Sequence, residues 1–534
     1  MAFQVSPGVA VSEIDASTTI PTASVSDAGF AGYFSQGPID QVVTIGSENE
    51  LVNIFGKPNS DNSSDWLAIS SFLAYGGSIQ VVRNAPNGAL NAVEAGGTAK
   101  LIKNKEEFEN DSSQAFQFAA RTAGDWSNNL NVVVLDSGHH ISASAFGAPK
   151  IDDTDTTTCH IFITDGAAAS NGDPISDNVV ESFLWLDTES GSVDGNGESN
   201  YYKNVINQKS QYVYAGDNNI VLEPESTGTD ATNGFQYIGM AGGVNGTEIP
   251  KDYTLFEDTE QVDLALIVSG TDGQEKALDL AIKRKDCVAF VSPELTDVNN
   301  NSDQSTKSNN VGLYRDTLGS SSYGFMDSGW KKMYDKYNDT WVKVPLNGDT
   351  AGLCVATDNN REPWYSPAGF NRGQVRNIAG LLFDPNQVSR DTLYKSNVNP
   401  VASFPGEGYV LFGDKTLQTK PSAFDRINVR RLFIVLEKAI ANAAKYSLFE
   451  FNDEFTRGQF ISMVDPFLRN IKGRRGIQDY LVVCDESNNT ADIIDRNEFI
   501  GDIFIKPSRS INFIQLNFVA VSTGVSFSEV VGAV

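Results

Sequence analysis

The chain has 534 residues, of which 40% are hydrophobic, so it can form several packed domains and lies outside the composition range of disordered proteins. Its net charge of −28 repels nucleic acid and anionic membranes, so neither is expected as a partner. Most of this charge lies before residue 421, because residues 421–534 hold 13 Lys and Arg against 14 Asp and Glu.

The cysteine pattern and the first residues indicate where the protein is made. Four widely spaced cysteines form neither a disulfide framework nor a zinc motif, which favours a reducing compartment. The opening MAFQVSPGVAVSEID lacks the basic and apolar regions of a secretory signal. No apolar run reaches the roughly 18 residues of a membrane-spanning helix. We therefore expect a soluble protein made in a cytoplasm, with no direct membrane insertion.

The first part of the chain predicts an arm followed by a compact region. Residues 1–25 are small, β-branched and turn-rich, which predicts an extended N-terminal arm. Residues 26–92 form a compact region. SENELVNIFG and DWLAISSFLAYGG predict helices there, and SIQVVRNA predicts a buried strand.

The central part of the chain changes texture twice. In residues 93–260, acidic and Ser/Thr/Asn/Gly-rich loops interrupt short strands such as LNVVVLD and HIFITD, which predicts a β-rich insertion of one or two domains. Residues 261–349 predict an α/β region. DLALIV, QEKALDLAIKRK and CVAFVSP read there as a βαβ unit, and TDVNNNSDQSTKSNN reads as a polar loop.

Residues 350–521 are the most regular part and predict a core domain. GQVRNIAGL and FDRINVRRLFIVLEKAIANAAKYSL read as helices, the second with an apolar stripe that includes Val429, Leu432 and Leu436. IQDYLVVCDES, NEFIGDIFIKP and SINFIQLNFVAV predict three antiparallel strands packed on those helices. The fold class is therefore α/β (α+β) and multidomain. Residues 522–534 form a C-terminal arm in which Val525, Phe527 and Val531 share one side of a strand.

The search for catalytic chemistry yields no site. The chain has three histidines, and neither H-E-x-x-H nor G-x-S-x-G occurs. The adjacent His139 and His140 point to opposite sides of a strand and cannot easily chelate one ion. Gly56-Lys57 lacks the glycine pattern of a phosphate-binding loop, and DGNGES (194–199) lacks the glycine at the sixth position of a calcium loop. We predict no catalytic residue, no cofactor and no metal.

A group of arginines near the C-terminal helices has two open interpretations. The residues are Arg426, Arg430, Arg431, Arg457, Arg474 and Arg475. They could form a basic face that meets a negatively charged partner. They could equally form ion pairs within their own domain, with Asp425, Glu437, Asp453 and Glu454.

Several strings together resemble one family, the tail sheath proteins of contractile bacteriophages of the large T-even-like type. The strings are SPGVAVSEID, LVNIFGKP, RTAGDWSNNLNVVV, RKDCVAFVSP, YDKYNDTWVKVPLNGDTAGLCVATD, PWYSPAGFNRGQVRNI, GEGYVLFGDKT, PSAFDRINVRRLF and VVCDESNNTADIIDRNEFIGDIFIKPSRSINFIQLNFVAV. The resemblance spans almost the whole chain. It implies an inner α/β core built from both chain ends, extended terminal arms, and β-rich domains inserted outward.

The resemblance also implies a function in the virion. Sheath subunits form stacked six-fold rings around the tail tube protein, next to baseplate and tail terminator proteins. The sheath contracts to drive the tube through the host cell envelope, with the energy stored in metastable subunit packing. This would be a structural protein and not an enzyme. A carbohydrate-binding or carbohydrate-active virion or surface protein is the alternative, suggested by the acidic, Asn/Gly/Thr-rich β region.

The resemblance further assigns roles to particular residues. Both arms of a sheath protein are exchanged with neighbouring subunits as added strands. Here the donated strands would be residues 8–14, with Val9 and Val11 inward, and 525–531, with Val525, Phe527 and Val531 inward. Gly524 would be a hinge. The basic residues that could face the tube are Arg430, Arg431, Arg474 and Arg475.

Overall fold

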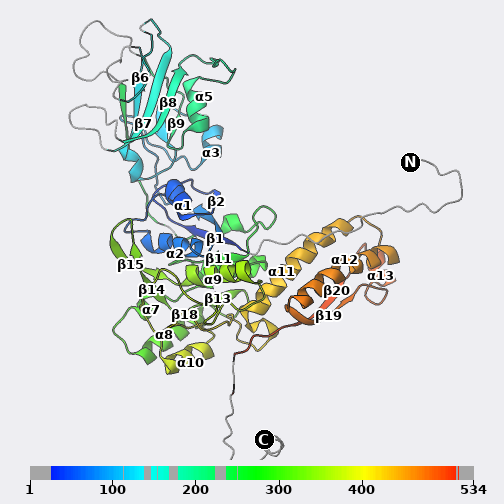
Figure 1. Cartoon of the computed structure of the whole chain (residues 1–534). Helices are drawn as coiled ribbons and strands as arrows, with labels where there is room; N and C mark the ends of the chain where they lie inside the picture. Colours follow the sequence, from blue (N-terminus) through cyan, green and yellow to red (C-terminus); the bar gives the residue numbers. More distant parts are fainter. Residues whose placement is uncertain are drawn as a thin grey trace, which may run out of the picture. The chain divides into compact units, whose positions relative to one another are not determined.

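The computed structural model describes residues 26–111, 113–137, 146–152, 154–166, 178–222, 236–248, 250–512 and 515. These residues fall into two compact units, each described here by itself. The main unit comprises the described residues within Pro21–Pro363 and Pro367–Ala443, and the C-terminal unit those within Trp364–Ser366 and Ala444–Val534. Several sheets and many helices alternate along the chain (Figure 1), which confirms the α/β multidomain class.

The central sheet of the main unit joins two distant stretches of sequence. Its strands run in the order β13-β12-β11-β1-β3-β2. All neighbours are parallel except β2 and β3, which are antiparallel. The bounds are β1 Asp27–Gly32, β2 Val42–Ile45, β3 Ser78–Arg83, β11 Leu266–Val268, β12 Val288–Val291 and β13 Gly324–Met326. The predicted βαβ unit is confirmed, because parallel strands β11 and β12 flank helix α6.

Helices accompany this sheet, and some of them begin at a side-chain cap. The Ser47 hydroxyl accepts the Glu50 amide at 3.3 Å at the start of α1, which satisfies a free helix N–H. The helices are α1 Glu48–Phe55, α2 Ser63–Leu73, α6 Gln274–Arg284, α7 Leu295–Val298, α8 Gln304–Thr317 and α9 Asn347–Asn360.

The predicted polar loop over 296–310 is wrong, because this stretch holds most of α7 and the first half of α8. Asp303 caps α8 by accepting the Thr306 amide at 3.0 Å. The buried face of α8 consists of Ser308, Val311, Gly312 and Arg315. Since only one of these four residues is a large apolar one, the sequence shows no apolar stripe.

A second sheet forms between residues 93 and 241. Its strands run in the order β8-β7-β6-β10-β4-β5-β9, and every neighbouring pair is antiparallel. Helices α3 Lys105–Asn110 and α5 Tyr202–Lys209 lie in the same stretch (Figure 1). The strands are β4 Val93–Glu94, β5 Phe118–Ala120, β6 Leu130–Leu135, β7 Thr158–Asp165, β8 Val179–Asp187, β9 Val213–Ala215 and β10 Gln236–Ala241.

A smaller antiparallel sheet and a hairpin complete the strands of the main unit. The sheet has the order β15-β14-β16, with β14 Trp330–Asp335, β15 Thr340–Pro345 and β16 Gly380–Leu381. The hairpin pairs β17 Val401–Phe404 with β18 Gly408–Leu411. The predicted helix over GQVRNIAGL is wrong: Gln374 bridges to Val410, and the Ala379 amide donates to the Lys332 carbonyl at 2.9 Å. Backbone pairing with distant strands therefore holds this stretch extended.

The remaining helices are α10 Gln387–Lys395 and the predicted long helix, which is confirmed as α11 Ile427–Ala444. Val429, Leu432 and Leu436 of the α11 stripe are buried. No helix among the described residues is long and apolar enough to cross a membrane.

The C-terminal unit contains α12 Glu454–Gly473, β19 Ile477–Val483, α13 Ala491–Asp495 and β20 Asp502–Pro507, after the short turn of helix Lys445–Ser447. The first two of the three predicted C-terminal strands are confirmed, because β19 and β20 pair antiparallel. Most of the third, SINFIQLNFVAV, lies outside the described residues.

Candidate assembly surfaces

The sheet of the C-terminal unit is supported on one side by α12 (Figure 1). Phe460, Val464, Leu468 and Ile471 recur at helical spacing along α12 and are buried. The Tyr480 hydroxyl of β19 donates to the Asp465 carboxylate at 2.9 Å, so this strand is held to the helix by a polar contact as well. This face of the sheet is therefore covered by a helix of its own unit.

The other side of this sheet is exposed and carries one apolar cross-strand pair between charged residues. In the register of β19 and β20, Leu481 lies opposite Phe504, and these side chains are 58% and 59% exposed. Among the described residues the sheet has two strands, so each strand has one edge without a partner strand. Two-stranded sheets are marginal in water, and unpaired edges readily accept a further strand. The geometry is therefore that of an acceptor for β-strand addition.

The residues predicted to donate strands lie outside the described part of the chain. This applies to Val9 and Val11 of the N-terminal arm, and to Val525, Phe527, Val531 and the hinge Gly524 of the C-terminal arm. Their roles remain predictions.

Two of the four arginines predicted to face the tube are buried within the main unit. Arg430 and Arg431 are each 4% exposed. Arg431 forms a bidentate ion pair with Asp358 of α9, with Nη1 2.9 Å from Oδ1. Burial alone would lower the pKa of Arg431, but the Asp358 carboxylate raises it, so the guanidinium stays charged. A side chain buried in its own subunit cannot contact a tube, so the expectation for these two residues is corrected.

Arg430 has a different environment from Arg431. Its guanidinium carbon lies 4.2 Å from the centroid of the Phe424 ring and 4.5 Å from that of Tyr323. Cation–π contact and apolar packing therefore account for this arginine inside the unit.

Arg474 and Arg475 do lie on the surface. They follow the last residue of α12, and both are exposed. The guanidinium of Arg474 lies 5.8 Å from the Trp364 ring centroid. Of the other arginines in the predicted group, Arg426 pairs with Asp414 at 3.7 Å and Arg457 donates to the Asn452 side chain at 2.9 Å. Contact of Arg474 and Arg475 with a tube remains a prediction.

His160 and the four cysteines are buried in the structure, whereas His139 and His140 lie outside the described residues. His160 is buried between the Pro149 carbonyl and the Trp185 amide, at 2.9 and 3.0 Å. Burial lowers the pKa of His160, so its neutral form is favoured. The four cysteines are free and buried. Within the described ranges no group of three or more His, Cys, Asp or Glu residues could hold a metal ion.

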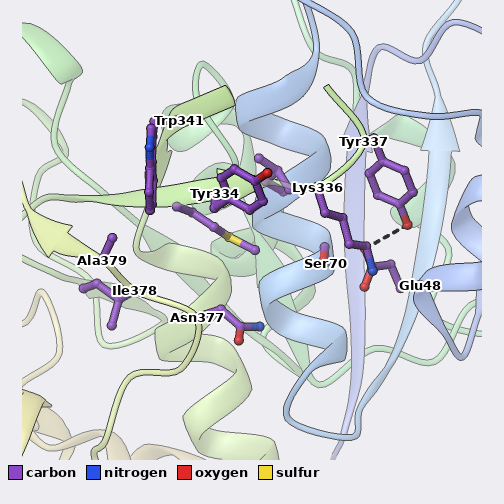
Figure 2. Close-up of a pocket in the computed structure, with 11 residues that line it drawn as sticks. Glu48, Ser70, Tyr334, Lys336, Tyr337, Trp341, Asn377, Ile378 and Ala379 are labelled. Carbon is purple, nitrogen blue, oxygen red and sulfur yellow. Dashed lines mark hydrogen bonds and ion pairs between the residues drawn. The ribbon is translucent and has the colours of Figure 1, made fainter. Parts of the chain in front are cut away.

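The sequence reasoning missed a pocket beside the β14–β15 hairpin, shown in Figure 2. It has a volume of about 460 Å³ and is lined by Glu48, Leu67, Ser70, Met333, Tyr334, Lys336, Tyr337, Trp341, Asn377, Ile378 and Ala379. The hairpin supplies its aromatic side, and α2 supplies Leu67 and Ser70. The Tyr337 hydroxyl donates to the Glu48 carboxylate at 3.0 Å (Figure 2). Alternation of aromatic and basic residues in KKMYDKYNDTWVK is the sequence signal that points to this surface.

Among the described residues, the unpaired strand edges, the exposed Leu481–Phe504 pair and the aromatic pocket are features typical of proteins that associate with other chains. Comparison with known proteins gives the family. The phage tail sheath protein central domain matches residues 251–417, and the phage tail sheath C-terminal domain matches residues 419–520. The tail sheath proteins of Vibrio phage KVP40 and Enterobacteria phage T4 are 32% and 31% identical to the chain, each over 99% of both sequences. The chain belongs to the tail sheath protein family of contractile bacteriophages.

Solved structures show the same fold at low sequence identity. The sheath complex of an extracellular contractile injection system in its contracted state matches with a TM-score of 0.53 and 13% identity, over 97% of this chain and 98% of that one. The sheath tail protein of Desulfitobacterium hafniense matches with a TM-score of 0.54 and 12% identity, over 94% of this chain and all of that one.

Proposed function

We propose that the chain is the subunit of a contractile tail sheath that polymerises as stacked six-fold rings around a tail tube. Contraction of this polymer drives the tube through the host cell envelope. The subunit is a structural component of the virion tail, is assembled in the host cytoplasm, and has no catalytic role. The observation that carries the proposal is the β19–β20 sheet, whose outer edges are unpaired among the described residues and which exposes the Leu481–Phe504 pair.

We propose that neighbouring subunits complete this sheet with strands from both arms. The donors are residues 8–14, with Val9 and Val11 inward, and 525–531, with Val525, Phe527 and Val531 inward. A strand of about six residues adds roughly 3–6 backbone hydrogen bonds at about 0.5–1.5 kcal/mol each, so one link is strong. Gly524 gives the C-terminal donor a flexible hinge. Such links let rings rotate during contraction without separating.

In this proposal the energy of contraction is stored in the packing of subunits and is not supplied by a bound nucleotide or cofactor. Extended and contracted sheaths are two packings of nearly rigid subunits, with the contracted one lower in free energy. Several hundred Å² of additional apolar burial per subunit corresponds to about 10 kcal/mol before losses. The loss of translational, rotational and side-chain entropy and the desolvation of polar groups reduce this free energy to roughly a few kcal/mol per subunit. Summed over many subunits, this energy is sufficient to move a tube.

We propose the following division of the chain: an N-terminal arm (1–25), a middle domain in two parts (26–92 and 261–349), an outer insertion (93–260), an inner core (350–521) and a C-terminal arm (522–534). The shared sheet of β1–β3 with β11–β13 supports one middle domain in two parts. The separate antiparallel sheet within 93–241 supports the insertion. Further partners are the tube protein, met by Arg474 and Arg475, and the baseplate and tail terminator proteins. The carbohydrate-binding alternative gains no support, because the relatives reported above are sheath proteins by name.

Strand donation is tested by removing residues 523–534. We expect the shortened chain to remain folded and monomeric and to form no long tubular polymers, because no subunit can then donate its C-terminal strand to a neighbour. Polymer length in negative-stain electron microscopy is the measurement. A finer comparison replaces Val525, Phe527 and Val531 by Asp on one side of the strand, and Ser526 and Ser528 by Asp on the other.

The first set of Asp substitutions should abolish polymers, while the second should preserve them, because only the first set faces the acceptor sheet. Normal polymers from the shortened chain would show that this arm is not a donor.

A further inference from the structure

The outward face of the β14–β15 hairpin carries an unusual pairing of side chains. In the antiparallel register Lys332 lies opposite Lys343, and Tyr334 lies opposite Trp341. All four side chains are exposed, and the Lys332 ammonium lies 5.1 Å from the Trp341 ring centroid. Like charges directly opposite each other on a sheet are destabilising. Within the described residues, neither lysine forms an ion pair. This face, in a chain of net charge −28, is locally basic and aromatic.

The pocket of Figure 2 adjoins this face. Trp341 and Tyr334 stand on its hairpin side, with ring centroids 5.3 Å apart, and Ile378 and Ala379 lie below Trp341 in the view. Leu67 and Met333 in its lining are buried and apolar. At about 460 Å³, the pocket is within the size range of sites that enclose small aromatic groups. The surface is thus suited to an aromatic ring with a carboxylate beside it.

The chain itself contains a segment with the matching chemistry. The aromatic linker, which we define as residues 446–455, runs from the turn after α11 into the first two residues of α12 and reads YSLFEFNDEF. Tyr446, Leu448, Phe449, Phe451 and Phe455 are all exposed. Phe449 has no part of its side chain covered and has φ +69°, an unfavourable region for a bulky residue. Exposed Glu450, Asp453 and Glu454 add negative charge between these rings.

We propose that the aromatic linker of one subunit docks on the hairpin pocket of a second copy of this chain. One phenylalanine ring enters the pocket beside Trp341 and Tyr334. Glu450 or Glu454 lies between Lys332 and Lys343 and relieves their repulsion. Buried aromatic anchors surrounded by complementary charge are typical of interface hot spots. This contact rests on the proposed self-assembly and adds to it a second, side-chain-mediated link that does not involve strand donation.

A second copy is the occupant that charge and composition favour. The linker brings three carboxylates and three phenylalanines, while the hairpin face brings two lysines without ion pairs and an aromatic pair. In a polymer every subunit carries both surfaces, so each contact forms at high local concentration and a modest affinity is sufficient.

The test measures binding of a synthetic peptide, residues 446–456, to the full-length chain by isothermal titration calorimetry. We expect saturable binding that weakens as salt is raised. Lys332→Glu with Lys343→Glu should weaken it at least about tenfold, because two attractions to the linker's carboxylates become two repulsions. Lys276→Glu with Lys420→Glu reverses two exposed lysines elsewhere and should leave binding unchanged. Circular dichroism verifies that both variants remain folded.

Two further results decide between occupants. A peptide with Phe449, Phe451 and Phe455 replaced by Ser should not bind; equal binding would mean that any acidic peptide is accepted, and would overturn the proposal. Glu450→Lys with Glu454→Lys in the full chain should shorten polymers alone, and mixing this chain with the Lys332→Glu/Lys343→Glu chain should restore length. Absence of restoration would show that the contact does not form between copies.

Failure of peptide binding would refute this contact and leave strand donation standing. Normal polymers from the chain without residues 523–534 would refute donation by this arm and leave the contact standing.

Discussion

At the scale of single residues, buried charges determine how this chain responds to substitution and pH. Lys331 of β14 and Asp349 of α9 form an ion pair at 2.8 Å with both side chains fully buried, and the Tyr75 hydroxyl donates to the same carboxylate at 3.1 Å. Asp327 is also fully buried, and no cationic side chain among the described residues lies at hydrogen-bond distance from it. Its carboxylate accepts the Ser292 hydroxyl at 2.7 Å and the Gly329 amide at 2.9 Å.

Asp327 makes the stability of the main unit depend on pH. Burial raises the pKa of Asp327 from its usual 3.8 to about 8 in the folded chain. Between these two values the folded state binds a proton that the unfolded state releases, so this residue's contribution to stability falls as pH rises from about 4 to about 8. Asp327→Asn removes this contribution.

We expect Asp327→Asn to gain stability over the unmodified chain by up to about 1.4 kcal/mol per pH unit across that window. Urea unfolding at several pH values is the measurement. Asp391→Asn, an exposed carboxylate of α10, is the control and should show no such trend. A difference between Asp327→Asn and the unmodified chain that does not change with pH would contradict the prediction.

At the scale of elements, α9 is positioned by close contact with α2 and with the residues that follow α2. A Cβ at Gly348 would overlap the Ala68 carbonyl of α2, and a Cβ at Gly352 would overlap the Tyr75 ring. The side chains of Leu353, Cys354 and Val355 complete the same buried helix. Glycine is therefore required here for helix approach and not for backbone conformation.

Gly352→Ala separates packing from helix propensity. Alanine is favoured over glycine inside a helix by up to about 1 kcal/mol, but overpacking a buried site costs typically 1–3 kcal/mol. Because the Tyr75 ring cannot move freely while it binds Asp349, we expect net destabilisation of about 1–2 kcal/mol in urea unfolding.

Gly312→Ala in α8 of the same unit is the matched control for Gly352→Ala. The nearest atom to its added Cβ is the Ser396 hydroxyl at 3.3 Å, which can rotate away. We expect this variant to be neutral or slightly stabilised. If Gly352→Ala were equally tolerated, close packing would not position α9.

At the scale of the whole molecule, apolar side chains that are exposed in the single chain are consistent with its membership in the tail sheath family. The Leu481–Phe504 pair lies on the open face of the β19–β20 sheet, and aromatic residues project from residues 446–455. Apolar exposure of this kind is a liability in a monomer and is typical of an interface.

Leu481→Asp with Phe504→Asp tests whether the open sheet face is an interface. We expect the double variant to fold, because both side chains are already more than half exposed, and to form no tubular polymers in negative-stain electron microscopy. Val388→Asp introduces the same change at another exposed apolar residue, and its polymers should be normal. If the double variant, Val388→Asp and the unmodified chain formed polymers of equal length, the open sheet face would not be an assembly interface.

The sequence alone determined features that depend on neighbouring residues. The βαβ unit of β11, α6 and β12, the long helix α11 and the strands β19 and β20 were predicted because their apolar periodicity is local. Family membership likewise followed from strings such as PSAFDRINVRRLF, which are present in the sequence without any structure.

Tertiary structure alone decided which residues share a surface. For Arg431 the sequence left a tube-facing position and an ion pair within its own domain equally open. The residue is buried and paired, because Asp358, 73 residues away, is brought to it by α9. The stretch 373–381 is extended and not helical, because strands distant in sequence supply its hydrogen bonds. The hairpin pocket likewise combines α2, β14, β15 and residues 377–379. Burial and pairing depend on contacts over long sequence separations, and local residue patterns carry no information about which distant segments meet.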